Sequence, residues 1–326
     1  MYKHRSVMLI AVCVACGLAY AAAPARVKGW PDAVRAVRYP SAADRTQQPA
    51  VFYAPESKDP VPLLVGLHTW SGDYRQSRPG AAYATWCIEK GWAFIGPNFR
   101  GPNRTPQATG SDLAVKDVLS AVDYAKTRVK VDPSRVYLVG VSGGGHMALL
   151  LAGRAPKVWA GVSAWVGISD LKAWHAECTK AKRKYARDIE LSCGGPPGKS
   201  AAVDRQYALR SPLTHLSAAR KARLPLDINT GVTDGHTGSV PVSHSLRAFN
   251  AAADPADRIA EKDIDQIVRT AKVPTHLRCK ISDRAYGPKV PLLRKTSGPV
   301  RVTLFKGGHE IVVPAALNWL ARQQRS

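Results

Sequence analysis

The residues with the clearest chemical potential are Gly-Val-Ser-Gly-Gly at positions 140–144. In a glycine-rich chain the pattern G-x-S-x-G also arises by chance, so its surroundings decide its meaning. The run 135–139 before it has the pattern of a buried strand, and the run 146–152 after it has the pattern of a helix. A serine at such a turn lies on a sharp backbone that exposes its hydroxyl, and the flanking glycines let strand and helix approach. Ser142 is therefore predicted to be a nucleophile rather than a bystander in a loop.

Two motifs give this region a resemblance to a known family. Gly-Leu-His-Thr-Trp at 66–70 and Gly-Val-Ser-Gly-Gly-Gly-His at 140–146 make the run 65–146 resemble the prolyl oligopeptidase-like branch of the α/β-hydrolases. The resemblance extends from about residue 62 to the C-terminus and implies a serine hydrolase of α/β-hydrolase fold. That branch contains peptidases and also secreted esterases, including acetyl esterases of plant polysaccharides, so the family alone does not define the substrate.

Two further residues are expected to complete a catalytic triad. A serine hydroxyl is a weak nucleophile at neutral pH, so it needs an imidazole to accept its proton and a carboxylate to fix the tautomer of that imidazole. In this fold the partners follow in the order Ser, Asp, His. His309 follows the last predicted strand and is the expected base, and Asp234 lies in a segment similar to the acid loop of the family. Asp227 is expected inside a strand.

Hydrolysis also needs hydrogen-bond donors for the oxyanion that forms on the attacked carbonyl. The fold supplies one backbone N–H from the residue after the nucleophile, here Gly143, and one from the loop after an earlier strand. The loop 68–72 resembles the oxyanion loop of the family, which makes Trp70 the second donor. The indole of Trp70 could equally line the acyl pocket or belong to the core.

Four other residues are candidates for substrate contact because they end or follow predicted strands: His68, Arg100, Trp165 and Trp174. Three of them have an alternative. His68 could be a packing residue, Arg100 could pair with an acid, and Trp165 could belong to the core. The sequence does not decide between these interpretations.

The elements that must position these residues alternate between strand and helix patterns, which predicts a mostly parallel sheet with helices on both faces. This α/β organisation is expected to form a single catalytic domain over residues 24–326. Strands are predicted at 63–67, 93–97, 136–141, 160–166, 226–229 and 300–305, preceded by an antiparallel pair at 34–39 and 50–53. Helices are predicted at 83–90, 112–127, 144–152, 242–251 and 314–323.

Two insertions interrupt the alternation, at about 170–217 and 254–299. The first leaves from the carboxyl end of a strand, where open α/β sheets place their sites, so it is predicted to cap the site and choose the substrate. The second is expected to hold a short helix near 263–270. Cys178 and Cys193 flank a polar segment of the first insertion and are predicted to form a disulfide bond, which export permits. The four cysteines that follow the predicted signal peptide form no C-x-x-C pair, and a triad needs no metal, so neither a metal nor a cofactor is expected.

Residues 1–23 have the pattern of a secretory signal peptide, with a basic start, an apolar run at 7–19 and small residues after it. A secreted or periplasmic protein without stable membrane insertion is therefore expected, and a lipid anchor at Cys16 is the less favoured alternative. The formal net charge is +23, but the basic residues are scattered and no nucleic-acid motif accompanies them. We expect affinity for an anionic polysaccharide rather than for nucleic acid.

These observations predict an enzyme that cleaves carboxylic esters through an acyl-enzyme, with acetyl or feruloyl esters of carbohydrates as substrates. Export, a compact catalytic domain and a basic surface suited to uronate-bearing polymers favour it. The alternative is a peptidase of the prolyl oligopeptidase type. Such peptidases usually carry a large propeller domain before the catalytic one, and only a few dozen residues precede the first predicted strand pair. A non-catalytic binding protein is a third interpretation, against which the set of Ser142, Asp234 and His309 argues.

Overall fold

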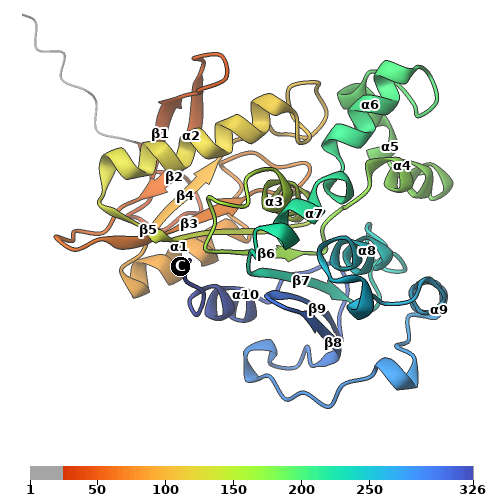
Figure 1. Ribbon diagram of the computed structural model, residues 1–326. Coiled ribbons are helices and arrows are strands. Elements are labelled where there is room, and N and C mark those ends of the chain that lie inside the picture. Colours follow the sequence, from red (N-terminus) through yellow and green to blue (C-terminus); the bar gives the residue numbers. More distant parts are fainter. Residues whose placement is uncertain (1–24, 326) are drawn as a thin grey trace, which may run out of the picture.

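The protein is described by a computed structural model that covers residues 25–325, so the predicted signal peptide lies outside the described residues. The described chain forms a nine-stranded sheet with the order β1-β2-β4-β3-β5-β6-β7-β9-β8 (Figure 1). The six strands from β4 to β9 in this order are parallel, and β1, β2 and β8 join antiparallel at the two edges. The predicted mostly parallel sheet is confirmed.

All the predicted strands and helices are present, with ends that differ by a few residues. The strands are β1 (Arg35–Pro40), β2 (Gln47–Tyr53), β3 (Val61–Leu67), β4 (Ala93–Pro97), β5 (Val131–Val141), β6 (Gly161–Trp165), β7 (Leu226–Gly231), β8 (Pro291–Ser297) and β9 (Val300–Phe305). The helices are α1 (Gly80–Lys90), α2 (Asp112–Arg128), α3 (Gly143–Arg154), α4 (Leu171–Lys180), α5 (Tyr185–Cys193), α6 (Ala201–Arg210), α7 (Leu216–Lys221), α8 (Ser243–Ala252), α9 (Glu261–Thr270) and α10 (Val313–Leu320).

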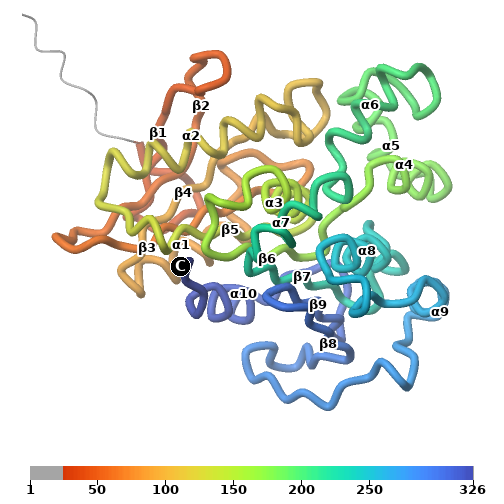
Figure 2. Tube along the Cα trace, in the orientation of Figure 1, coloured from red at the N-terminus to blue at the C-terminus, as the bar shows by residue number. Residues whose placement is uncertain are grey.

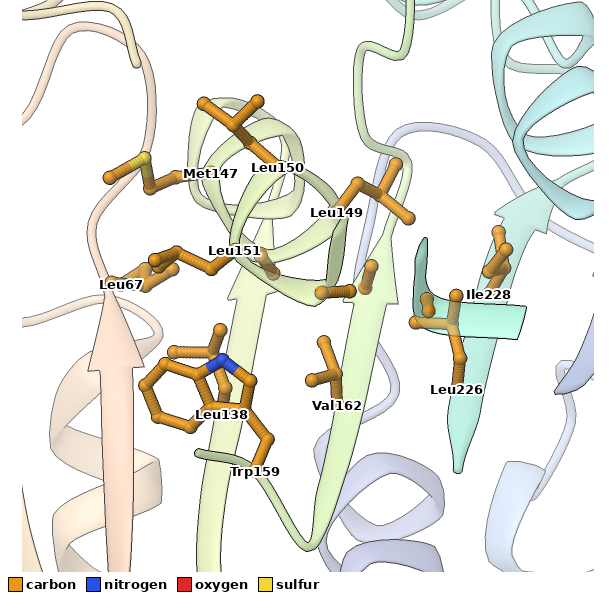
Figure 3. Packing of buried hydrophobic residues seen from close by; sticks show 14 of the residues in the cluster. Leu67, Leu138, Met147, Leu149, Leu150, Leu151, Trp159, Val162, Leu226 and Ile228 are labelled. Carbon is orange, nitrogen blue, oxygen red and sulfur yellow. The ribbon is translucent and has the colours of Figure 1, made fainter. Parts of the chain in front are cut away.

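Helices cover both faces of the sheet. On one face the apolar sides of α2, α3, α7 and α8 pack against the strands in the largest buried cluster. Figure 3 shows Leu149 and Leu151 of α3 above Leu138 of β5 and Val162 of β6. On the other face α1 and α10 close a second cluster. Because both faces are covered, the central strands are continuously apolar, which is why they could be recognised from the sequence.

The first insertion is helical and stands apart from the two sheet clusters. Figure 2 shows α4, α5 and α6 gathered at one side of the molecule, beyond the sheet. Their apolar sides form a third buried cluster, which also includes Trp70 and Val240 from the loops after β3 and β7. The insertion is therefore packed onto loops that follow the carboxyl ends of strands, where a cap was expected.

The predicted Cys178–Cys193 disulfide bond is not present, and this prediction was wrong. Both cysteines are buried free thiols in the third cluster. The segment between them is not a loose loop that needs a covalent link, because it forms most of α5 after a short turn. Burial raises the pKa of Cys178 to about 12 and that of Cys193 to about 11, so both side chains are neutral apolar packing groups.

The strand β8 was not predicted. It lies at the edge of the sheet within the second insertion and pairs antiparallel with β9. Its residues, Pro-Leu-Leu-Arg-Lys-Thr-Ser, are only half buried and carry charged side chains, so they lack the apolar run of a central strand.

No helix between residues 25 and 325 is both long and apolar enough to span a membrane.

Candidate active site

Ser142 lies at the tight turn between β5 and α3. Its backbone has φ 59° and ψ −118°, a conformation that residues other than glycine rarely adopt. The carbonyl of Ser142 accepts a hydrogen bond from the N–H of His146 at 2.8 Å, which starts the helix directly at the turn. A Cβ at Gly140 would lie 2.2 Å from the carbonyl oxygen of Gly144, so the strand and helix can approach only because this residue is glycine. The turn has the strained form expected of an exposed nucleophile.

Three side chains from separate loops meet at this turn. Nε2 of His309 lies 2.9 Å from Oγ of Ser142, and Nδ1 of His309 lies 2.8 Å from Oδ2 of Asp234. His309 follows β9 and Asp234 follows β7, so neighbouring parallel strands deliver the two residues to the same edge. The chain of contacts from hydroxyl to imidazole to carboxylate is the one that activates a serine.

The loop after β7 holds the carboxylate of Asp234 in place. Asp234 is buried, and its second oxygen, Oδ1, accepts hydrogen bonds from the backbone N–H groups of Gly235 at 3.0 Å and Val240 at 3.3 Å. These donors leave Oδ2 directed at the imidazole. Asp227, which precedes Asp234 in the sequence, instead lies inside β7 and forms an ion pair with Arg301 at 2.6 Å. It is therefore not available to His309.

The backbones of Gly143 and Trp70 lie against each other beside the serine. A Cβ at Gly143 would come within 2.3 Å of the backbone nitrogen of Trp70. The N–H of Gly143 is at the first position of α3, where no helical carbonyl is available to accept it. The carbonyl of Trp70 accepts the N–H of Asn103 at 2.9 Å, which fixes the orientation of the loop. This arrangement can place two donors on the oxygen of an attacked carbonyl.

A pocket of about 470 Å³ contains Ser142 and His309. Several of its lining residues were not singled out from the sequence: Thr69, Ser71, Arg78, Pro79, Tyr185, Ser239, Glu310 and Ile311. Tyr185 is the first residue of α5, so the first insertion supplies part of the pocket wall, as expected of a cap. Some of these residues directly neighbour Trp70 or His309 in the sequence and could have been predicted for that reason. No local pattern marks Tyr185 or Arg78.

His68 does not line this pocket, which corrects its expected role in substrate contact. Its ring stacks on Phe99 with centroids 3.8 Å apart, and its two nitrogens lie 2.9 Å from the carbonyl of Thr69 and 2.7 Å from that of Asn98. Burial lowers the pKa of His68. The side chain therefore supports the loop that carries Trp70 from behind.

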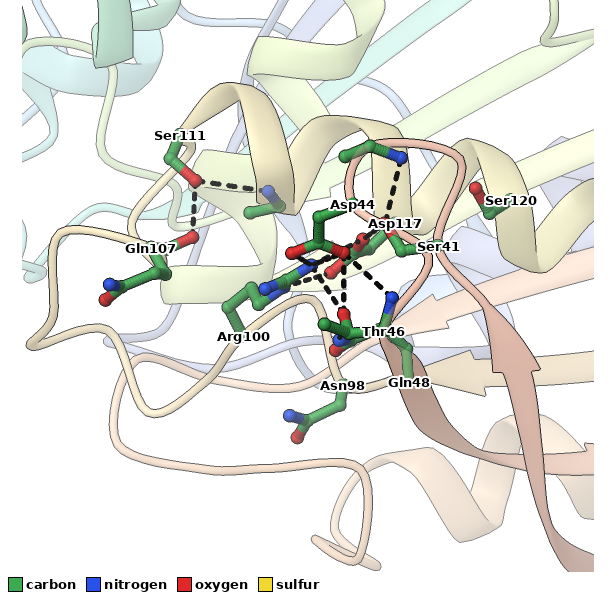
Figure 4. A network of polar contacts seen from close by, with 12 residues as sticks. Ser41, Asp44, Thr46, Gln48, Asn98, Arg100, Gln107, Ser111, Asp117 and Ser120 are labelled. Carbon is green, nitrogen blue, oxygen red and sulfur yellow. Dashed lines mark hydrogen bonds and ion pairs between the residues drawn. The ribbon is translucent and has the colours of Figure 1, made fainter.

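Arg100 is likewise not a pocket residue, and its alternative interpretation as the partner of an acid is the one the structure favours. Its guanidinium binds Asp117 of α2, with Nε 2.5 Å from Oδ2, and Asp44 at 2.9 Å (Figure 4). Asp117 is fully buried and also accepts a hydrogen bond from Ser41. Arg100 thus neutralises a buried carboxylate and joins the β1–β2 loop to α2.

The two tryptophans lie behind the pocket rather than in it. Trp165 is fully buried at the end of β6, where its indole donates to Ser163 at 2.8 Å and packs against Phe305. Trp174 is also buried, and its ring packs edge-on against Trp70 with centroids 4.7 Å apart. Trp165 is thus a core residue, and Trp174 acts on the pocket through Trp70. Within residues 25–325 no group of three or more His, Cys, Asp or Glu side chains is placed to hold a metal ion.

The fold and the Ser142–His309–Asp234 arrangement define a serine hydrolase of α/β-hydrolase type. The Prolyl oligopeptidase family profile matches residues 83–270, which is more than half of the chain. The chain therefore belongs to the prolyl oligopeptidase family. The matched range contains Ser142 and Asp234 and ends before His309.

Curated relatives include both esterases and peptidases. Feruloyl esterase B of Thermothelomyces thermophilus is 28% identical over an alignment of 195 residues. The alignment covers 52% of this chain and 66% of the esterase. Dipeptidyl aminopeptidase BIII of Pseudoxanthomonas mexicana is 25% identical over an alignment of 213 residues. The alignment covers 63% of this chain and 30% of the peptidase. The match thus spans less than two thirds of the length of either relative.

Solved structures of both kinds share the fold. A puromycin-hydrolysing peptidase of Mycobacterium tuberculosis superposes with a TM-score of 0.55 at 20% identity, over 73% of this chain and 38% of the peptidase. A thermostable esterase superposes with a TM-score of 0.52 at 15% identity, over 90% of this chain and 64% of the esterase. The predicted α/β-hydrolase fold is confirmed.

Proposed function

We propose that this chain is an exported serine esterase that removes acyl groups, feruloyl or acetyl, from carbohydrates. The observation that carries the proposal is the composition of the pocket around Ser142. Its described lining combines an aromatic side chain with hydroxyl groups and one cation, Arg78, and offers no unpaired carboxylate.

The size and lining of the pocket suit an acyl group with part of its sugar. At about 470 Å³ the pocket lies within the range of about 300–1,000 Å³ typical of small-molecule sites, and it is larger than an acetyl group requires. Tyr185, which packs edge-on against the buried Trp70, offers aromatic surface for a phenolic acyl group, and Ser71 and Ser239 offer hydroxyl groups for sugar oxygens. This combination favours a feruloyl ester above an acetyl ester.

The charge of the pocket argues against an aminopeptidase. A substrate with a free α-amino group needs a carboxylate to compensate its buried positive charge. Among the described residues, the only acid that lines the pocket is Glu310, whose Oε1 already accepts a hydrogen bond from Nζ of Lys289 at 2.7 Å. Partial burial raises the pKa of Glu310, but the hydrogen bonds from Lys289 and from the Gly308 N–H outweigh it and leave the pKa lowered. Glu310 is thus an ionised side chain that already has a cationic partner.

In the proposed reaction, Oγ of Ser142 attacks the ester carbonyl and its proton passes to Nε2 of His309. Asp234 holds the imidazole and stabilises the imidazolium that forms. The N–H groups of Gly143 and Trp70 stabilise the oxyanion. The sugar alcohol leaves with the proton from His309, and a water molecule activated by the same imidazole then hydrolyses the acyl-enzyme. The relatives support this chemistry in general, since they include a feruloyl esterase.

The second candidate is a peptidase, which the dipeptidyl aminopeptidase relative favours. A substrate panel separates the two: methyl ferulate, nitrophenyl acetate, acetylated xylan and a proline-containing anilide. We expect turnover of methyl ferulate with the highest kcat/KM, and none of the anilide. Turnover of the anilide without any ester would overturn the proposal.

Variants tie the activity to the proposed triad. Ser142→Ala should abolish labelling by a fluorophosphonate, and His309→Ala should lower kcat by several orders of magnitude. His276→Ala is the matched control. The side chain of His276 is 62% exposed, pairs with Asp263 at 3.1 Å and does not line the pocket of Ser142. Labelling of Ser142→Ala, or an equal loss in His276→Ala, would refute the triad. Export is tested separately by sequencing the N-terminus of protein recovered outside the cytoplasm, with cleavage expected after Ala21 or Ala23.

A further inference from the structure

A second, larger cavity of about 1,110 Å³ lies between the segment 282–289, the strands β8 and β9, and the start of α10. We refer to it as the basic groove. Five of its lining residues carry positive charge: Arg284, Lys289, Arg294, Arg301 and Arg322. Two carry negative charge, Asp283 and Glu310. The groove is thus a basic depression whose walls come largely from the second insertion.

The basic groove adjoins the catalytic pocket. Glu310 and Ile311, which follow His309 directly, line both cavities. The ion pair between Lys289 and Glu310 stands at this shared wall. The groove and the pocket of Ser142 therefore share a wall at residues 310–311, which would place one end of a long molecule in the groove beside the pocket.

The cations of the groove fall into two sets. Three are held in place by acids: Lys289 pairs with Glu310 as described above, Arg294 binds Asp283 at 3.0 Å, and Arg301 binds Asp227 at 2.6 Å. Arg284 and Arg322 are exposed and form no ion pair with any described residue. The groove thus has more positive than negative charge, and two of its guanidinium groups can receive an anion. A guanidinium presents paired N–H donors that match the two oxygens of a carboxylate.

We propose that the basic groove binds the carboxylate groups of a uronate-bearing polysaccharide while the acylated unit of the same chain enters the catalytic pocket. The chemistry of the groove favours this ligand over a nucleic acid. Single-stranded nucleic acids bind through bases stacked on exposed aromatic rings, and the aromatic residue of the groove, Tyr286, is only 1% exposed beneath Arg294. The choice of an acylated polymer rests on the proposed esterase function, whereas the anion site itself does not.

The test measures binding without turnover. The Ser142→Ala protein, which keeps the whole groove, is titrated by calorimetry with a de-esterified oligogalacturonate and with a neutral xylo-oligosaccharide of equal length. We expect the uronate to bind more tightly than the neutral oligomer, and its affinity to fall as salt rises, because exposed charges are screened. Introducing Arg284→Ala and Arg322→Ala into the Ser142→Ala protein should weaken uronate binding about five- to tenfold, in line with the loss of two exposed charge contacts.

Matched variants separate a specific site from general charge. Arg284→Lys with Arg322→Lys keeps both positive charges but loses the paired N–H donors, so its affinity should lie between those of the parent and the alanine variant. Arg104→Ala with Arg205→Ala removes two exposed arginines outside the groove, and its affinity should equal that of the parent. An equal loss in this control, or no loss in the groove variant, would overturn the proposal.

Two further outcomes keep this inference distinct from the esterase proposal. If the Ser142→Ala protein binds oligogalacturonate but the wild type hydrolyses no ester, the esterase function fails and the anion site stands. If the wild type hydrolyses esters and oligogalacturonate does not bind, the groove inference fails alone. Equally tight binding of single-stranded RNA, lost in the same groove variant, would overturn the assignment of a uronate.

Discussion

At the scale of single residues, the position of Trp70, the proposed oxyanion donor, depends on a side chain of the insertion. Its indole Nε1 donates to Oδ2 of Asp188 on α5 at 3.2 Å. The same ring packs edge-on against Trp174. These contacts hold the Trp70 backbone against Gly143, so Asp188 is a positioning residue for the oxyanion site.

Asp188→Ala should therefore lower kcat about tenfold with little change in KM, because a displaced oxyanion donor weakens contacts made mainly in the transition state. Steady-state kinetics with methyl ferulate measures the two constants. Asp188→Asn keeps an acceptor for the indole and should recover most of kcat, which a purely structural role would not require. A rise in KM at unchanged kcat would instead place Asp188 in ground-state substrate binding.

The residues of the candidate triad were predictable, whereas their surroundings were not. Ser142 lies in a local motif between a strand and a helix, and the order of the fold then points to Asp234 and His309. The contacts of Arg100 depend on the β1–β2 loop and α2, which are distant in sequence from each other. No local pattern reveals whether an arginine after a strand faces a substrate or a buried aspartate. Tyr185 reaches the pocket only through the packing of the insertion.

At the scale of secondary structure elements, buried His146 joins α3 to the insertion. Its Nε2 donates to the carbonyl of Arg210, at the end of α6, at 2.9 Å. The side chain is 1% exposed, and burial lowers its pKa to about 4. In the folded protein the imidazole therefore stays neutral between about pH 6.5 and pH 4, where the unfolded chain takes up a proton. The unfolded state binds more protons in this window, so stability falls as the pH falls through it.

His146→Gln keeps an N–H donor and removes this titration. Between pH 7 and pH 4.5 the free energy of unfolding of the wild type should fall by about 2 kcal/mol more than that of the variant, from the linkage of this one group. Urea denaturation at several pH values measures the difference. Parallel curves for His146→Gln and the wild type would refute the assignment.

The elements themselves show where sequence patterns suffice. The central strands were recognised because burial on both faces makes them continuously apolar, as in β3 and β9. The helices α4 to α6 of the insertion were not placed, because their short amphipathic sequences bury only a few residues each. The cysteine prediction failed for a related reason. Spacing along the chain does not report the geometry that a disulfide bond requires.

At the scale of the whole molecule, residues 25–325 form three apolar clusters of unequal extent. Two cover the faces of the sheet, and the third, smaller one holds α4, α5 and α6 together with Trp70 and Val240. Regions with fewer buried apolar contacts open at lower free energy than the strands of a central sheet. Because the third cluster includes the loops that carry the oxyanion donor and the acid, its opening would also disrupt the active site.

We therefore expect the insertion to unfold before the sheet. In native-state hydrogen exchange, amides of α5 and α6 should exchange at a lower free energy than amides of β5 and β6. Ile189→Ala removes a fully buried side chain from the third cluster and should lower the opening free energy of the insertion by about 2–4 kcal/mol while sparing the strands. Leu138→Ala, in the sheet cluster, should lower the protection of both regions, since global unfolding exposes them together. If Ile189→Ala lowered protection equally in β5 and α5, the insertion and the sheet would be one cooperative unit, and the cap could not open without unfolding the whole enzyme.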